Sequence, residues 1–150
     1  MTIRNYVFMS AIVLLALSCK SSKETSQAAT TQETTLENTH WRLVEVLGKP
    51  IAEYGEQMKT PEFYFDSKEN RVSGNAGCNQ IFGSYKLKEG SRIEFGPLAS
   101  TQMACQNMSL EQIFTQNVEN IDTYAIYDNR EMILTKARMA PVFRFVKVNE

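Results

Sequence analysis

The sequence predicts a mainly β domain with one packed α-helix. Short runs of alternating apolar and polar residues are separated by clusters rich in Gly, Pro, Asn and Asp, which is typical of antiparallel strands joined by tight turns. One longer segment has apolar residues three and four positions apart, the spacing of an amphipathic helix. The chain has 150 residues, of which 43% are apolar and 10% aromatic, enough for one modest core.

Eight segments of the chain are expected to be extended. They are residues 41–46, 62–65, 71–73, 81–87, 92–95, 123–127, 131–135 and 142–148. The first is expected to end at residues 48–50 (Gly-Lys-Pro) and the fifth at Gly96-Pro97, because Gly and Pro interrupt strands. Strands of period two with closely spaced turns favour a sandwich or a barrel.

The helix is expected to begin at Ser109. Ser109 is followed three positions later by Gln112, which predicts a capping box at the helix start. An apolar stripe on one face of this helix is expected to pack against the sheet as part of the core. The stripe consists of Leu110, Ile113, Phe114, Val118 and Ile121.

Residues 1–18 predict a secretory signal peptide. Arg4 and the amino terminus supply positive charge, and the apolar run over residues 6–17 is shorter than the roughly 20 residues needed to span a bilayer. Residues 15–19 (Leu-Ala-Leu-Ser-Cys) resemble a bacterial lipobox, with Ala16 where leucine is usual. We therefore expect Cys19 to be lipidated and to become the mature N-terminus. The alternative is an ordinary secreted protein with a cysteine at the cleavage site.

Residues 19–35 are expected to be the lipidated cysteine and a flexible tether, and residues 36–150 the folded domain. The tether has no aromatic residue and no aliphatic residue larger than alanine, so burial cannot offset its ordering entropy. Lys20 follows Cys19 directly, which by resemblance to Gram-negative sorting patterns favours the outer membrane. We expect a lipid-anchored protein of the cell envelope, facing either the periplasm or the cell surface.

Composition argues against several classes of function. The formal net charge is −1, which does not favour a nucleic-acid partner. The chain has one histidine, His40, so sites that need several histidine ligands are excluded. His40 is expected to be a solvated or lightly packed residue at a strand end rather than a member of a catalytic triad. No catalytic residue, metal site or cofactor is predicted.

Two segments stand out from the strand pattern. Residues 74–79 (Gly-Asn-Ala-Gly-Cys-Asn) favour a tightly constrained turn, because glycine and asparagine tolerate positive φ. A phosphate-binding loop is less well supported, since neither a Gly-Lys-Ser/Thr sequence nor a helix follows. The second segment is residues 99–105 (Ala-Ser-Thr-Gln-Met-Ala-Cys).

These segments, in this order and spacing, resemble the META-domain (HslJ-like) family. The resemblance covers residues 36–148, with Ala140-Pro141 where a glycine is often seen. It implies a compact antiparallel β-barrel-like fold with one helix, and an association with envelope stress, heat induction and, in some members, novobiocin resistance. It implies no catalytic residue. The residues that carry it are Trp41, Gly74, Gly77, Cys78, Asn79, Gly83, Tyr85, Thr101, Met103, Ala104, Cys105, Glu111 and Phe114.

Cys78 and Cys105 allow three interpretations. Once Cys19 is lipidated, two cysteines remain in an exported chain, which favours a disulfide. Such a bridge would close a loop of about 27 residues and stabilise the fold by about 3.5 kcal/mol in the chain-entropy model. The alternatives are two buried thiols, or a soft-metal or redox pair near Met103.

The function expected from these features is binding rather than catalysis. The leading hypothesis is a non-enzymatic envelope lipoprotein that supports stress tolerance through an unidentified envelope protein or small molecule. The alternative is a small-molecule binder that uses a cavity inside the barrel. An enzyme is the third class, and it lacks a recognisable nucleophile, base or metal set in the sequence.

Overall fold

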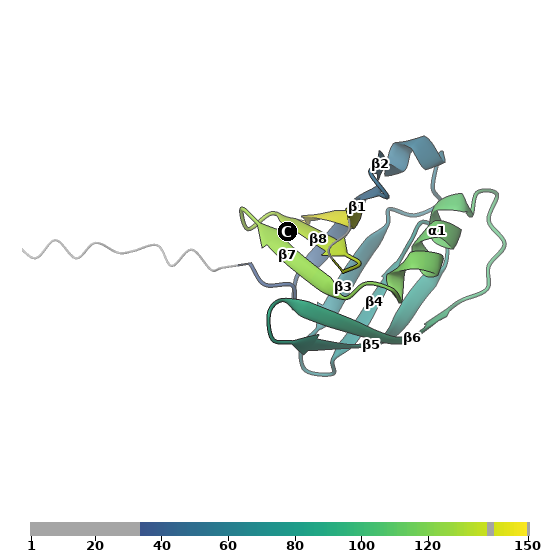
Figure 1. Cartoon of the computed structure of the whole chain (residues 1–150). Coiled ribbons are helices and arrows are strands. Elements are labelled where there is room, and N and C mark those ends of the chain that lie inside the picture. The colour runs from purple at the N-terminus through teal and green to yellow at the C-terminus, as the bar shows by residue number, and fades with distance from the viewer. Residues whose placement is uncertain (1–33, 138–139, 150) are drawn as a thin grey trace, which may run out of the picture. The chain divides into compact units, whose positions relative to one another are not determined.

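The structure, a computed structural model, describes residues 34–137 and 140–149. The predicted signal peptide, Cys19 and most of the predicted tether lie outside the described residues. The described part of the chain contains nine strands, one α-helix and one short 3₁₀ helix (Figure 1). In chain order these are β1 (His40–Val46), β2 (Lys49–Pro50), η1 (Ile51–Tyr54), β3 (Glu62–Asp66), β4 (Arg71–Asn75), β5 (Gln80–Lys88), β6 (Arg92–Ser100), α1 (Ser109–Val118), β7 (Thr123–Tyr127), β8 (Glu131–Thr135) and β9 (Pro141–Lys147).

The strands form one antiparallel sheet that nearly closes into a ring. Their order is β2-β1-β3-β4-β5-β6-β7-β8-β9, and β9 also pairs with β1. The junction between β6 and β7 is the weakest, because it is confined to the pair Arg92 and Thr123. The predicted mainly β, barrel-like fold with one helix is therefore confirmed, as a near-ring rather than a formal barrel.

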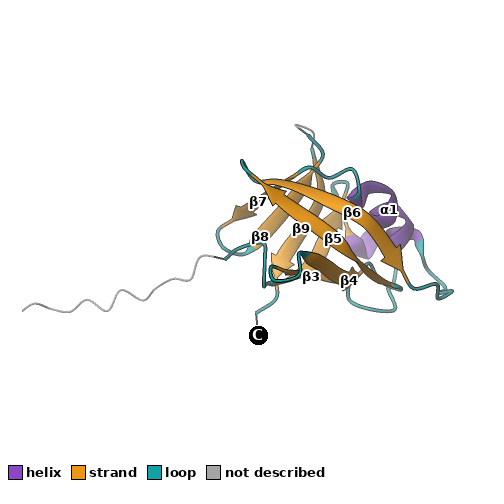
Figure 2. Cartoon of the chain, turned by 90° about the horizontal axis from the view of Figure 1, so that it is seen from below, coloured by secondary structure: helices purple, strands orange, loops and turns teal. Residues whose placement is uncertain are grey.

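Helix α1 closes the ring where β6 and β7 diverge, and Figures 1 and 2 both show it beside the end of β6. The Phe114 ring of α1 lies 4.6 Å from the Phe63 ring of β3 and 4.7 Å from the Phe143 ring of β9. Four of the five residues predicted as the apolar stripe are buried, and Ile113 packs against the core, although Ile121 lies beyond the end of α1 at Val118. The prediction that this stripe belongs to the core is confirmed. No helix among the described residues has the length and hydrophobicity needed to cross a membrane.

Strand β6 does not end at Gly96-Pro97 as predicted, but continues to Ser100. Gly83 pairs with Leu98 and Tyr85 with Phe95, so Ser84 alone faces both Gly96 and Pro97. This is a β-bulge, in which a proline without an N–H group is tolerated because the ladder is interrupted there. At the same bulge a Cβ atom on Gly96 would clash with Ser84 Oγ, so a larger residue there would require the Ser84 side chain to move.

The helix start also differs from the prediction. The N-cap residue is Met108, and no side chain caps the helix in the manner of a capping box. Instead the Asn107 Oδ1 atom accepts hydrogen bonds from the Ser109 N–H (3.1 Å) and from the Ser109 hydroxyl (2.7 Å). The predicted capping box of Ser109 and Gln112 is therefore wrong, because the N–H and the hydroxyl group of Ser109 both donate to Asn107 Oδ1.

Residues 34–39, the N-terminal segment, pack onto the ring. Thr34 is buried, and its hydroxyl donates to the Asn129 carbonyl oxygen (3.0 Å) and accepts from Lys147 Nζ (3.0 Å). Leu36 is buried, and its carbonyl oxygen accepts a hydrogen bond from Nε1 of the fully buried Trp41 (2.9 Å). Thr34 and Thr35, which the sequence assigned to the tether, thus belong to the folded domain.

Candidate functional site

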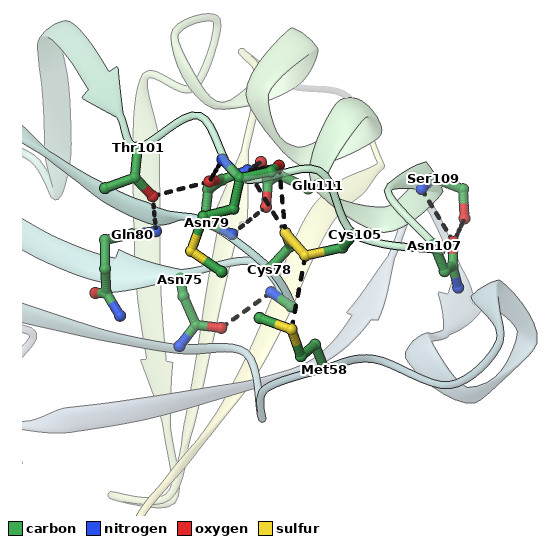
Figure 3. The surroundings of a disulfide bond; sticks show 12 residues. Met58, Asn75, Cys78, Asn79, Gln80, Thr101, Cys105, Asn107, Ser109 and Glu111 are labelled. Atoms are coloured by element: carbon green, nitrogen blue, oxygen red, sulfur yellow. Dashed lines mark hydrogen bonds between the residues drawn. A yellow bond between two sulfur atoms is a disulfide. The ribbon is translucent and has the colours of Figure 1, made fainter.

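Two loops meet at one end of the ring and are joined by a disulfide. Cys78 lies between β4 and β5, and Cys105 lies between β6 and α1 (Figure 3). Their Cα atoms are 6.3 Å apart, within the range that a disulfide spans without backbone movement. Of the three interpretations of this pair, the disulfide is the one the structure contains. The alternatives of two buried thiols and of a soft-metal pair are set aside for this oxidised form.

Beside the disulfide, the buried Asn79 is the centre of a hydrogen-bond network. The Asn79 backbone N–H donates to Glu111 Oε2 (2.6 Å), and Asn79 Nδ2 donates to Glu111 Oε1 (2.7 Å). Its other side-chain atom, Oδ1, accepts from the Thr101 hydroxyl (2.8 Å) and from the Met103 N–H (2.7 Å). We call Cys78, Asn79, Thr101, Met103, Cys105 and Glu111 the Asn79 cluster.

The position of Glu111 explains why a carboxylate is tolerated in this buried place. Glu111 is buried at 5% exposure, and both of its carboxylate oxygens accept hydrogen bonds from Asn79. It also lies in the first turn of α1, where the positive end of the helix dipole favours a negative charge. These contacts tie the β4–β5 loop, the β6–α1 loop and the helix to one another.

The glycines of residues 74–79 serve close packing. Gly77 has a φ of +113°, and a Cβ atom there would clash with the Gln57 side chain. A Cβ atom on Gly74 would clash with the Glu62 carbonyl oxygen on the neighbouring strand. Gly74 and Asn75 belong to strand β4, so the turn is confined to residues 76–79. The constrained turn predicted for this segment is confirmed in that shorter form.

The remaining residues of the resemblance lie elsewhere in the ring. Gly83 pairs with Leu98 beside the bulge. Tyr85 is buried at 1% exposure, and its hydroxyl donates to Glu37 Oε1 (2.6 Å) and to the Asp66 carbonyl oxygen (3.2 Å). Burial, and then the hydrogen bond to the Glu37 carboxylate, raise the pKa of Tyr85 well above its ordinary value. Tyr85 and Trp41 thus hold the N-terminal segment, whereas Asn79 and its partners hold the other end.

A solvent-open hollow, the disulfide groove, lies beside Cys105. It is lined by residues 56–58 and 104–107 and has a volume of about 680 Å³. Met58 is 56% exposed, and its Sδ atom lies 3.8 Å from Cys105 Sγ. Asn107 Nδ2 holds the two walls together by donating to the carbonyl oxygens of Tyr54 (2.5 Å) and Glu56 (3.3 Å). Met103, beside the groove in sequence, is 43% exposed.

Sequence reasoning found Ala104 and Cys105 but missed Gln57, Met58 and Asn107 as groove residues. Residues 56–58 follow η1, a short helix that the turn signal at residues 48–50 did not predict. The hydrogen bond from Asn107 to the Glu56 carbonyl oxygen joins residues 51 positions apart, so no local spacing reveals it.

The interior of the ring is filled by its own side chains. Phe114 and Val118 of α1 and Phe95 and Leu98 of β6 border a void of about 10 Å³, room for about one water molecule. Ligand pockets usually measure about 300–1,000 Å³. A second open hollow of about 490 Å³ lies near Leu47, on the surface. The two hollows of ligand size described here, the disulfide groove and the one near Leu47, are therefore both open to solvent.

The other chemically interesting residues lie apart from this groove. His40 is exposed at the start of β1, with its ring 4.7 Å from that of Tyr64. Within residues 34–137 and 140–149, no group of three or more His, Cys, Asp or Glu side chains is placed to hold a metal ion. The predicted lipidation site, Cys19, lies outside the described residues.

Solved structures of similar fold include proteins from two bacteria, Burkholderia xenovorans and Bacteroides vulgatus. The chain is 26% identical to a protein from Burkholderia xenovorans solved by NMR, with a TM-score of 0.58 over 77% of this chain and 85% of that chain. A second protein solved by NMR is 23% identical, with a TM-score of 0.57 over 73% and 89% of the two chains. A DUF4847 family protein from Bacteroides vulgatus ATCC 8482 is 13% identical, with a TM-score of 0.53 over 77% and 96%. The last two show likeness of fold alone.

The family comparison agrees with the motifs. No curated protein matches the chain significantly. The META domain profile matches residues 34–149. This range begins at the buried Thr34 and includes every residue of the Asn79 cluster. The chain belongs to the META domain family.

Proposed function

We propose that this protein is a lipid-anchored protein of the cell envelope that supports tolerance of heat or antibiotic stress by binding a partner at the disulfide groove, without catalysing a reaction. The anchor is proposed from the signal-like segment and Cys19 in the sequence. The stress role is proposed from membership of the META domain family.

The observation that carries the binding proposal is that this end of the ring has two sets of groups. One set is hydrogen-bonded within the protein, and the other set faces the groove. The polar atoms of Asn79, Thr101 and Glu111 hydrogen-bond to one another and hold the loops in place. The groove beside them instead presents exposed Met58, Ala104 and Gln106 on walls fixed by the disulfide and Asn107. A rigid, exposed surface with thioether and amide groups supports recognition of a protein or small molecule.

The groove also favours surface binding over binding within the barrel. The void of about 10 Å³ between α1 and β6 is far smaller than usual ligand pockets, whereas the groove has about 680 Å³. A partner would meet the groove without any strand of the ring having to separate. This supports an external binding surface as the working hypothesis, with an envelope protein or a small molecule as its occupant.

The test is complementation of a strain that lacks this gene. Ala104 is exposed and lines the groove, so Ala104→Arg should fill the groove without disturbing the core. We expect Ala104→Arg and Cys19→Ala to reduce survival after heat or novobiocin to that of the deletion strain. Cys19→Ala should also release the protein from membranes into the soluble fraction.

Ala99→Arg is the matched control, because Ala99 is exposed on β6 but does not line the groove. It should complement as well as the unaltered protein, with expression of each variant checked by immunoblot. Full stress tolerance in cells carrying Ala104→Arg would contradict binding at the groove. Retention of Cys19→Ala in membranes washed with high salt would contradict the lipid anchor.

A further inference from the structure

The two sulfur atoms of the disulfide have different surroundings. Cys78 is buried at 1% exposure, within the Asn79 cluster. Cys105 is partly exposed and lines the disulfide groove. A thiolate arriving from solvent therefore reaches Cys105 Sγ through the open groove, whereas Cys78 Sγ is shielded. Which sulfur is attacked decides the course of thiol–disulfide exchange.

The buried sulfur already has partners suited to a departing thiolate. Asn79 Nδ2 lies 3.6 Å from Cys78 Sγ, and its two N–H groups are shared among this sulfur, Glu111 Oε1 (2.7 Å) and the Met103 carbonyl oxygen (3.3 Å). The Met103 carbonyl oxygen lies 3.8 Å from the same sulfur and can accept a hydrogen bond once Cys78 is protonated. Cys78 thus has a stable place in the fold as a thiol.

The backbone around Cys105 is free to move once the disulfide is cut. On either side, Thr101 and Met103 are bound to Asn79, and Asn107 is bound to Tyr54. Between these points, residues 104–106 make no backbone hydrogen bond with other described residues. Cutting the disulfide would therefore release residues 104–106, and with them one wall of the groove, while the ring stays closed.

From these contacts we infer that Cys105 is a site of thiol–disulfide exchange, attacked in the folded protein by the thiolate of a low-molecular-weight thiol or of a dithiol oxidoreductase. The incoming sulfur bonds to Cys105 Sγ, the Cys78–Cys105 bond breaks, and its electron pair leaves on Cys78 Sγ, which then takes a proton. A second thiol attacks the reductant's sulfur in the mixed disulfide and releases Cys105. The protein disulfide gains two electrons, and the two reductant thiols become a disulfide.

The first test maps the mixed disulfide. Mature protein carrying Cys19→Ala, in which Cys78 and Cys105 are the remaining cysteines, is treated with reduced glutathione, quenched with acid and analysed by peptide mass spectrometry. We expect glutathione on Cys105, and a reduction rate that does not rise with urea below the unfolding transition. Glutathione on Cys78, or a rate that rises with the full slope of global unfolding, would overturn the inference.

The second test compares the two thiols directly. In the same background, Cys78→Ser leaves Cys105 as the sole thiol and Cys105→Ser leaves Cys78, and both lose the same disulfide. Cys105 should react with Ellman's reagent faster by an order of magnitude or more, since a buried thiol is inert. Equal rates in variants whose circular dichroism is native would overturn the inference. If either variant fails to fold, the glutathione map of the disulfide-intact protein still decides.

The source of the thiolate is distinguished by a third arm. Thioredoxin and an equal concentration of dithiothreitol are compared as reductants of the disulfide-intact protein. Faster reduction by thioredoxin identifies a protein dithiol that fits the groove, and equal rates identify small thiols. Ala104→Arg should slow thioredoxin and glutathione more than dithiothreitol, because a bulky reductant needs the groove. Unchanged rates for all three reductants in Ala104→Arg would overturn entry through the groove.

Discussion

The N-terminal segment and the Asn79 cluster are both held against the ring without strand pairing, but by different interactions. The two regions lie toward opposite ends of β3. Tyr85, which holds the N-terminal segment, bonds to Asp66, whereas Gly74, which precedes the Asn79 cluster in the chain, packs on Glu62. The N-terminal segment relies on the burial of Leu36 and on hydrogen bonds from Trp41 and Tyr85. The Asn79 cluster adds a covalent bond and a buried carboxylate.

The comparison teaches that the two ends respond to different conditions. The N-terminal segment depends on a tyrosine hydroxyl that must stay protonated, so alkaline pH should loosen it. The Asn79 cluster depends on a disulfide, so thiols should loosen it. Because Cys105 of the cluster lines the groove and no residue of the N-terminal segment does, reduction rather than pH is the condition that should change the groove.

The largest effect is expected at Trp41, which both the core and the N-terminal segment use. Trp41→Ala should lower the free energy of unfolding by about 3–5 kcal/mol, since it removes a large, fully buried side chain. Trp41→Phe is the control, as it keeps an aromatic ring and loses the hydrogen bond to Leu36. Urea titration measures both. Red-shifted fluorescence of Trp41, the sole tryptophan, in the native protein would show an exposed ring and contradict the assignment.

A smaller loss is expected at Glu111 in the Asn79 cluster. Glu111→Ala should destabilise the protein by about 3 kcal/mol, because hydrogen bonds to a charged group each contribute roughly 1.5–3 kcal/mol and two donors of Asn79 lose their acceptor. Glu119→Ala is the matched control, since Glu119 is exposed just beyond α1. Urea titration with the disulfide intact measures the difference. Equal stability of the two variants would contradict a stabilising role for Glu111.

The N-terminal segment should show its own pH dependence through Tyr85. Burial and the bond to Glu37 raise the pKa of Tyr85 in the folded protein, whereas an unfolded tyrosine titrates near a pKa of about 10. The stabilisation is therefore complete below pH of about 10 and is lost as the pH rises above it, because the unfolded chain releases a proton that the folded one keeps.

Tyr85→Phe should flatten this alkaline fall in unfolding free energy and cost about 1.5 kcal/mol at neutral pH, the value of one hydrogen bond to a charged group. Tyr127, which is 52% exposed, supplies the control Tyr127→Phe. Denaturant titrations between pH 7 and pH 11 (about one unit beyond the ordinary tyrosine pKa) measure both. The same alkaline slope in Tyr85→Phe as in the unaltered protein would contradict the role of this hydroxyl.

The smallest effect concerns the tether. Removing residues 20–33 should leave the free energy of unfolding unchanged, because they contain no large apolar side chain. Extending the deletion through Thr35 should cost about 1 kcal/mol, since Thr34 bonds to Asn129 and Lys147. Thermal melts of the two truncations test this boundary. A large loss from the shorter deletion would mean that the tether contributes to the fold.

The strands were predictable because their signal is local. Alternation and turn residues place residues 123–127 and 131–135 as the structure has them, and Asp128 and Asn129 adopt the positive φ that their turn requires. The bulge at Ser84 and the role of Asn107 were not predictable, because each depends on a partner brought close by the fold. Local propensity cannot report such partners.

The candidate site, like the fold, was predictable from the sequence only in part. The spacing of Cys78 and Cys105 allowed a disulfide but could not choose it over two buried thiols, since that choice depends on the distance between their Cα atoms. Asn79 and Glu111 are 32 positions apart, so their pairing has no signal in local spacing. The groove needs residues from two loops and could not be seen before both were placed.

Hydrogen exchange of the oxidised and the reduced protein tests the central claim most directly, namely that the disulfide controls one end of the ring alone. After reduction at neutral pH, we expect faster exchange of the hydrogen-bonded amides that flank the released residues 104–106, those of Met103 and Ser109, and unchanged protection in β1, β3, β8 and β9. Tyr85 and the N-terminal segment should keep their protection as well. A uniform rise across all strands, or no change beside Cys105, would contradict the account.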